Sequence, residues 1–224
     1  MKYLWTEDTG AGLHFWKLVS RLFFDNALVI ESKESNQGIL DALSDLSMKE
    51  DDAYYIAFDY VVDNQDIRNK YRILKSIAER SEGKIIILDM ICFEHLILAF
   101  DKLVEWTGTG KTDKIKIREE VLSATMNHRI NLSKIDDEKT LQYIAGFKRY
   151  STERVMKALV AEFTENEKWS VKGSLMGDCW YKDCCVSGHP DSLRCGKPEV
   201  EGGSEKMRML IQSETVRKIL QKVN

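Results

Sequence analysis

Lys84-Ile85-Ile86-Ile87-Leu88-Asp89 is the stretch of this 224-residue chain that decides the fold. Residues 85–88 are four consecutive aliphatics, so neither of the two alternating faces carries a polar side chain. A strand of this kind is buried on both sides, which is typical of a parallel sheet covered by helices. The strand ends at Asp89, and Gly83 ends the helix expected before it.

Three more strand-like runs precede this stretch, and each is followed by an amphipathic segment. The expected strands are residues 2–6, 27–30, 53–58 and 84–88, and the expected helices are residues 13–24, 36–46, 65–82 and 92–106. Right-handed crossovers between parallel strands need a covering layer of helices. The alternation therefore predicts an α/β, Rossmann-like domain with a four-stranded, mostly parallel sheet and helices on both faces.

The character of the chain changes after the glycine-rich residues 107–110. Residues 113–127 and 137–168 are expected to be helical, with no strand between them. Residues 173–203 are rich in Gly, Cys and Pro, and an amphipathic helix is expected over residues 204–223. We therefore divide the chain into an α/β domain (1–107), a helical extension (108–172) and a Cys-rich loop module with a C-terminal helix (173–224).

Composition indicates a folded protein without membrane spans. Hydrophobic residues make up 43% of the chain and charged residues 31%, which is typical of globular proteins. Glu7 and Asp8 interrupt any signal-peptide hydrophobic region at the N-terminus. The longest apolar region, residues 85–100, contains Asp89, Glu94 and His95 and is too polar to span a bilayer. These features predict a cytoplasmic protein.

Charge is distributed unevenly along the chain. Residues 1–107 carry 12 basic and 19 acidic side chains, whereas residues 108–172 carry 13 basic and 10 acidic ones. An acidic site beside a basic segment suits metal ions held against a polyanion such as nucleic acid. The alternative is that these charges form ordinary solvated faces. The candidate contacts to a nucleic-acid backbone are Lys111, Lys114, Lys116, Lys148 and Arg149.

Acidic residues follow the ends of three of the four predicted strands. Glu7 follows the first strand, Asp59 and then Asp63 follow the third, Asp89 follows the fourth, and Glu94 opens the next helix. Ligands of open parallel sheets bind beyond the carboxyl ends of the strands. Clustered carboxylates repel one another unless a cation neutralises them, and oxygen ligands suit Mg²⁺ or Mn²⁺. The alternative is that these acids are turn and cap residues.

A Glu closing the first strand and acids closing the third resemble the TOPRIM fold of topoisomerases, primases and OLD-type nucleases. Residues 91–100, Ile-Cys-Phe-Glu-His-Leu-Ile-Leu-Ala-Phe, are similar to a stretch in RloB-like TOPRIM relatives of phage-defence loci. The resemblance covers roughly residues 2–105. It implies acid–base chemistry for Glu7, metal binding by Asp59, and a matching acid in Glu94.

Two positions depart from the pattern of this family. Val61 stands where the family has its second aspartate, and Asp63, two residues later, is the candidate replacement. Asp8 stands where the family has a glycine. The metal ligands that the resemblance implies are therefore Glu7, Asp59 and Asp63, with Asp89 as a further supporting acid.

Four of the five cysteines fall within seventeen residues near the C-terminus. In a cytoplasmic protein, clustered cysteines favour a metal over disulfides. The candidate ligands of a structural Zn²⁺ are Cys179, Cys184, Cys185, His189 and Cys195, because zinc takes four ligands in a tetrahedron. Reduced thiols packed with Trp180 and Tyr181, or a redox pair, are the alternatives.

These features lead to one main functional hypothesis and two rivals. The main hypothesis is a Mg²⁺- or Mn²⁺-dependent nuclease, or a related phosphoryl-transfer protein, that belongs to a phage-defence system and works with a protein partner. The first rival is a non-catalytic binding or regulatory subunit on a degenerate TOPRIM-like scaffold. The second is a small-molecule or nucleotide-binding α/β protein that uses the Thr9–Gly12 turn, which opens a helix and whose amides could hold a phosphate.

Overall fold

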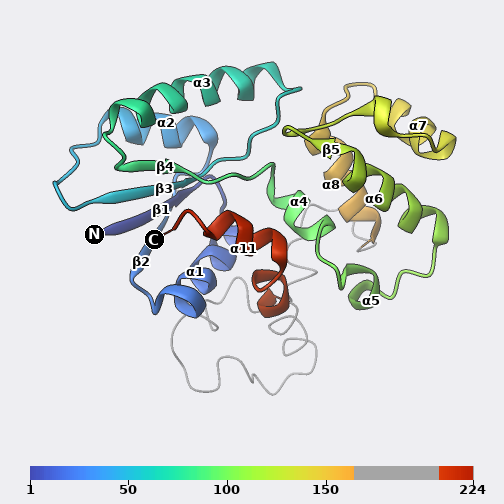
Figure 1. Ribbon diagram of the computed structural model, residues 1–224, viewed down its shortest axis with the longest axis horizontal. Helices are drawn as coiled ribbons and strands as arrows, with labels where there is room; N and C mark the ends of the chain where they lie inside the picture. Colours follow the sequence, from blue (N-terminus) through green and yellow to red (C-terminus); the bar gives the residue numbers. More distant parts are fainter. Residues whose placement is uncertain (164–206, 224) are drawn as a thin grey trace.

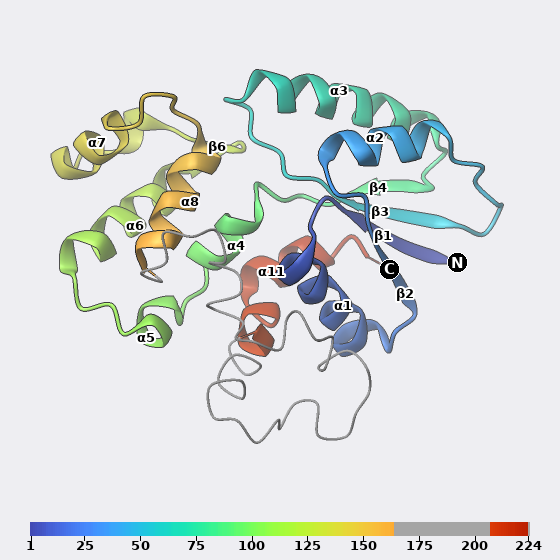
Figure 2. The same ribbon diagram turned by 180° about the vertical axis from the view of Figure 1, so that it is seen from behind.

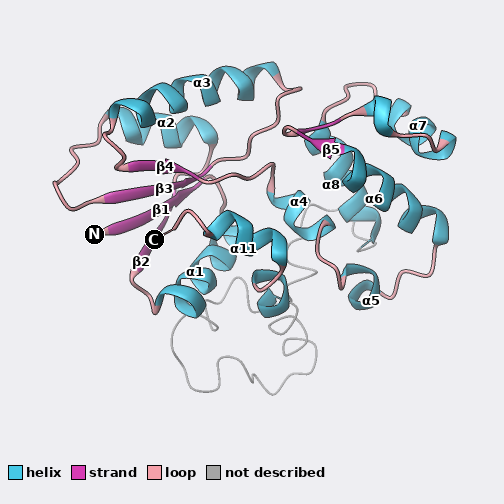
Figure 3. Ribbon diagram, in the orientation of Figure 1, coloured by secondary structure: helices cyan, strands magenta, loops and turns pink. Residues whose placement is uncertain are grey.

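Four strands form the central sheet of the structure, a computed structural model that describes residues 1–163 and 207–223. They are β1 (Lys2–Thr6), β2 (Leu28–Ser32), β3 (Ala53–Ala57) and β4 (Ile85–Ile87). Their order is β2-β1-β3-β4, and every neighbouring pair is parallel (Figure 3). The predicted four-stranded α/β sheet is therefore confirmed, and it is parallel throughout.

Successive residues of β1, β3 and β4 enter two separate apolar cores, one on each face of the sheet. Leu4 and Tyr55 belong to one core, whereas their chain neighbours Trp5 and Ile56 belong to the other. This alternation follows from the two-residue period of a strand. Because both faces are buried, β3 and β4 carry apolar or aromatic residues at every position.

Helices cover both faces of this sheet (Figures 1 and 2). α1 (Gly10–Phe24) lies on one face, and α2 (Asn36–Ser44) and α3 (Gln65–Arg80) lie on the other. The chain moves from β1 to β2 in one direction and then past β1 to β3 in the opposite direction. Right-handed crossovers therefore place α1 and α2 on opposite faces.

The C-terminal residues complete the core on the face that α1 covers. α11 (Glu214–Leu220) lies beside α1 (Figure 1), and helical residues 207–211 precede it, so the helix predicted over residues 204–223 is divided. Lys222 Nζ donates to Ile87 O of the edge strand β4 at 3.3 Å. The buried side chains of this region are Met207, Leu210, Ile211, Val216, Ile219, Leu220 and Val223.

The helix predicted over residues 92–106 is wrong in its continuity. It forms two helices, α4 (Phe93–Leu98) and α5 (Leu103–Thr107). The buried Arg118 of α6 (Thr112–Ala124) donates from Nε to Leu98 O at 2.7 Å and from Nη2 to Phe100 O at 2.9 Å. A guanidinium thus binds the carbonyl of the last residue of α4 and that of Phe100, which also accepts from Leu103 N.

A short hairpin lies where the sequence predicted no strand, which is a second correction. β5 (Thr125–Met126) and β6 (Arg129–Ile130) are antiparallel and are joined by Asn127 and His128. Both turn residues have positive φ, 49° and 59°, as a two-residue hairpin turn of this type requires. Strands of two residues are too short to show a hydrophobic period, so they could not be predicted from the sequence pattern.

The remaining described helices are also shorter than predicted. After a 3-10 turn (Leu132–Lys134), the expected helix 137–168 is divided into α7 (Glu138–Ala145) and α8 (Thr152–Phe163). Within the described part of the chain, no helix is both long and apolar enough to cross a membrane.

The candidate zinc ligands, Cys179, Cys184, Cys185, His189 and Cys195, lie outside the described residues, within 164–206. The zinc site and the loop module therefore stay predictions. The described helices of 108–163 and the C-terminal residues share one continuous apolar cluster with the α1 face of the sheet.

The contact of Arg118 with α4 yields a first prediction. Arg118→Met keeps most of the side-chain volume but removes the donors to Leu98 O and Phe100 O. We expect the free energy of unfolding to fall by about 2 kcal/mol, because buried carbonyls lose a charged donor. Urea denaturation measures the change. Arg72→Met, an exposed position on α3, is the control, and an equal effect of both substitutions would contradict this role for Arg118.

Candidate functional site

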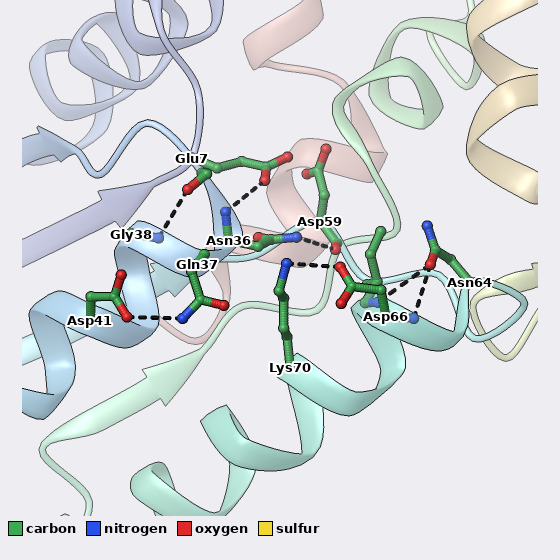
Figure 4. Close-up of polar contacts among 11 residues, drawn as sticks. Glu7, Asn36, Gln37, Gly38, Asp41, Asp59, Asn64, Asp66 and Lys70 are labelled. Atoms are coloured by element: carbon green, nitrogen blue, oxygen red, sulfur yellow. Dashed lines mark hydrogen bonds and ion pairs between the residues drawn. The ribbon is translucent and has the colours of Figure 1, made fainter.

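Glu7 and Asp59 meet at the carboxyl edge of the sheet. Residues Thr6 and Ala57 are register partners on the adjacent strands β1 and β3, and each acid follows within two residues. Asn36 connects them: its backbone N–H donates to Glu7 Oε2 at 3.1 Å, and its Nδ2 donates to the Asp59 carbonyl at 3.1 Å. Figure 4 shows the two carboxyl groups turned toward one another beside Asn36.

The turn before α2 places Asn36 in this position. The Ser35 hydroxyl caps the helix by accepting from Gly38 N at 2.9 Å. A Cβ atom at Gly38 would lie 2.0 Å from the Lys33 carbonyl, so only glycine fits this turn. The start of a helix carries partial positive charge, which stabilises the Glu7 carboxylate that Asn36 N–H binds. The loop thus orients the Glu7 carboxylate.

Asp63 has a structural role at the start of α8. Its Oδ2 accepts from both the backbone N–H and the hydroxyl of Thr152, at 2.8 and 2.7 Å. The Thr152 hydroxyl also accepts from Ile130 N of the hairpin at 2.9 Å. Val61, at the position of the second aspartate of the TOPRIM pattern, is buried and apolar. The β3–α3 loop therefore uses its second acid to hold the helical extension.

Asp89 also contacts the extension, through the hairpin. His128 Nε2 lies 3.0 Å from Asp89 Oδ1, and His128 Nδ1 lies 3.2 Å from the carbonyl of Tyr60. The carbonyl of His128 accepts from Val62 N at 3.2 Å. The tip of the hairpin is thereby joined to the loops that follow β3 and β4.

Glu94 lies with an acid that sequence reasoning missed, Glu153. Glu94 opens α4, Glu153 opens α8, and these two helices pack together. Burial raises the pKa of Glu153, and the charges of Glu94 and Asp63 raise it further. Burial also raises the pKa of the Cys92 thiol, and so do the charges of Glu94, Asp59 and Glu153. Acids from three elements therefore lie close around Cys92.

Asp8 occupies the turn that was the candidate phosphate site. It is buried, and its Oδ2 accepts from the Thr6 hydroxyl at 3.0 Å and from Trp16 Nε1 at 3.1 Å. A Cβ atom at Gly12 would lie 2.3 Å from Asp8 Oδ1, so the carboxylate stands directly against the start of α1. A negative charge there repels an anion, which disfavours a nucleotide phosphate at the Thr9–Gly12 turn.

The candidate nucleic-acid contacts fall into two groups. Lys111, Lys148 and Arg149 are exposed. Lys114 lies 3.6 Å from Glu162, and Lys116 pairs with Asp137. Lys116 is the first cause that lowers the pKa of Asp137 to about 2, followed by hydrogen bonds from Thr140. Four of the five candidates, Lys116 among them, are therefore exposed cations, and Lys114 and Lys116 have carboxylate partners.

The donor set at the edge consists of two adjacent carboxylates. In the parts of the chain that the structure describes, no three His, Cys, Asp or Glu side chains form a group that could hold a metal ion by themselves. Mg²⁺ is commonly bound through one or two carboxylates, with water and substrate phosphates completing its shell. Glu7 and Asp59 fit that mode of binding.

Comparison with known proteins yields no family model, no curated protein and no solved structure that matches this chain.

His95, beside Glu94, provides a prediction about pH. Burial first, and the charge of His128 second, lower its pKa to about 4, compared with about 6.5 in an unfolded chain. Between these values the unfolded state binds the proton and the folded state does not, so stability is lost as pH falls from 6.5 toward 4. We expect His95→Gln to reduce this loss by an amount on the order of 1 kcal/mol.

Urea denaturation of the wild type and of His95→Gln at several pH values in this range measures the effect. The stability of the variant should depend less steeply on pH. Equal slopes for the two proteins would contradict a neutral, buried His95.

Proposed function

We propose that this protein is a divalent-cation-dependent phosphoryl-transfer protein, specifically a nuclease, that acts on nucleic acid. The observation that carries the proposal is that the Glu7 and Asp59 carboxylates lie together at the carboxyl edge of a parallel sheet, where Asn36 binds the Glu7 carboxylate and the Asp59 backbone carbonyl. This edge is where open α/β sheets bind their ligands. The TOPRIM resemblance of residues 2–105 supports the same assignment.

The residues at this edge have distinct proposed roles. Asp59 and Glu7 would hold Mg²⁺ or Mn²⁺, which supplies positive charge to a phosphodiester and acidifies a bound water. Glu7, whose carboxylate is oriented by Asn36 N–H, would also accept or return the proton of the attacking water. Glu94 and Glu153 would add negative potential that attracts the cation.

Asp63 and Asp89 have different roles in this proposal. Asp63 caps α8 and Asp89 contacts His128, so both position the helical extension relative to the sheet. The exposed cations Lys111, Lys148 and Arg149 would contact the phosphate backbone. A phage-defence context with a protein partner is the part of the proposal that rests on the resemblance alone.

Two conservative substitutions test the cation site. Glu7→Gln retains an oxygen that accepts from Asn36 N, and Asp59→Asn leaves unchanged the backbone carbonyl that Asn36 Nδ2 binds. In the wild type we expect Mg²⁺ or Mn²⁺, about tenfold above its Kd, to raise Tm by about 3 °C. Both variants should lose this shift, and both should lose cleavage of plasmid DNA or RNA.

Asp41→Asn is the matched control, because Asp41 lies on α2, is exposed, and among the described residues its side chain bonds Gln37 alone (Figure 4). It should retain both the thermal shift and cleavage. A wild-type Tm that neither cation changes, together with uncut substrates, would contradict the proposal.

The second candidate is a non-catalytic binding or regulatory subunit on the same scaffold. It is favoured by the structural use of three edge acids, Asp8, Asp63 and Asp89. A protein of this kind would melt identically with and without divalent cations, and Glu7→Gln would leave nucleic-acid binding intact.

A further inference from the structure

A cavity of about 410 Å³ lies beyond the end of β4, outside the Glu7–Asp59 pair. Three segments that are distant in sequence line it: the β4–α4 loop with the start of α4, the β5–β6 hairpin, and α11. Its size is in the range of small-molecule sites. The lining residues on which the argument depends are Asp89, Ile91, His95, Met126, Lys218 and Ile219.

His95 offers unused hydrogen-bonding capacity to this cavity. Its imidazole has no hydrogen-bond partner among residues 1–163 and 207–223. Burial lowers its pKa to about 4, so the ring is neutral at pH 7 and offers one donor and one acceptor. A partly buried polar ring without a protein partner is costly unless a ligand or water binds it.

Asp89 and Lys218 provide opposite charges in the lining. Asp89 is 65% exposed and contacts His128 through one oxygen, Oδ1, so the carboxylate is oriented but accessible. Lys218, on α11, is 66% exposed and lies 2.7 Å from Glu214. An ammonium has three donors, so it can bind an anion while it keeps this contact.

Apolar side chains from the same three segments line the cavity as well. Ile91 comes from the β4–α4 loop, Met126 from the hairpin and Ile219 from α11. Met126 is 44% exposed. Thioether and aliphatic groups of this kind suit the faces of a flat ring, and the carboxylate and imidazole suit its polar edge.

We propose that this cavity binds a single nucleotide, with the base between the apolar side chains and the phosphate at Lys218. The choice of a nucleotide rests on the proposed function, which makes nucleic acid the substrate. A carboxylate accepts well from the adjacent N–H groups of guanine, whereas uracil has one N–H between two carbonyls. GMP therefore binds more tightly than UMP.

Isothermal titration calorimetry with GMP, AMP, CMP and UMP, in EDTA, tests the proposal on the full chain. Asp89→Asn replaces the carboxylate that accepts from the base, and Met126→Trp fills the cavity from an exposed position without removing a polar group. Each should weaken GMP binding by about tenfold or more. Asp113→Asn is the control, because Asp113 is 67% exposed and pairs with Lys139 far from the cavity lining.

If none of the four nucleotides gives a binding heat at millimolar concentration, the proposal is overturned. Binding that both cavity variants leave unchanged would overturn it too. Glu7→Gln separates this inference from the nuclease proposal, since it should bind GMP as the wild type does. If cleavage fails but GMP binds, the cavity stands alone; if GMP fails but cations bind and substrates are cut, only the cavity is lost.

Discussion

All four strands of the sheet run in the same direction, so each delivers its last residues to the same edge. Every loop after a strand must satisfy its backbone groups there, and every acid that ends a strand arrives there. Asn36 links two of these acids: its backbone N–H binds the Glu7 carboxylate, and its side chain binds the backbone carbonyl of Asp59. This residue helps to position the turn before α2 and the two acids, and therefore the proposed cation.

The acids of the edge divide into two groups with different physical roles. Asp8, Asp63 and Asp89 bind donors on α1, α8 and the hairpin, so their charges hold neighbouring elements in place. Glu7 and Asp59 instead lie at Asn36, and Glu94 and Glu153 lie near Cys92; burial first, and then the charges of Glu94 and Asp63, raise the pKa of Glu153. A bound cation would reduce the repulsion among these carboxylates. We therefore assign the proposed function to the second group of acids and not to the first.

Much of the fold could be predicted from local sequence, because a strand of consecutive aliphatic residues such as 85–88 is stable only where both of its faces are buried. The ends of the later helices and the β5–β6 hairpin could not be predicted in this way. Arg118 ends α4 from twenty residues away, and Asp63 caps α8 across 89 residues. The hairpin depends on two positive-φ residues, Asn127 and His128, and on strands too short to have a period. Contacts between distant segments decide these features.

The candidate site was predictable to a similar extent. Strand ends identified Glu7 and Asp59, because chain direction alone brings them together. Glu153 could not be found in this way, since it is one acid in the first turn of a helix and only the packing of α8 on α4 brings it beside Glu94. Asp63 was identified as an acid near the edge, but its partner, Thr152, was invisible from sequence spacing.

The cation site at Glu7 and Asp59 is tested most directly by anomalous diffraction from a crystal grown with Mn²⁺. This measurement locates the cation without relying on turnover. We expect an anomalous peak between the carboxylates of Glu7 and Asp59, with Asn36 still hydrogen-bonded to both residues. A map with no peak at this edge, or carboxylates that point away from each other, would contradict it.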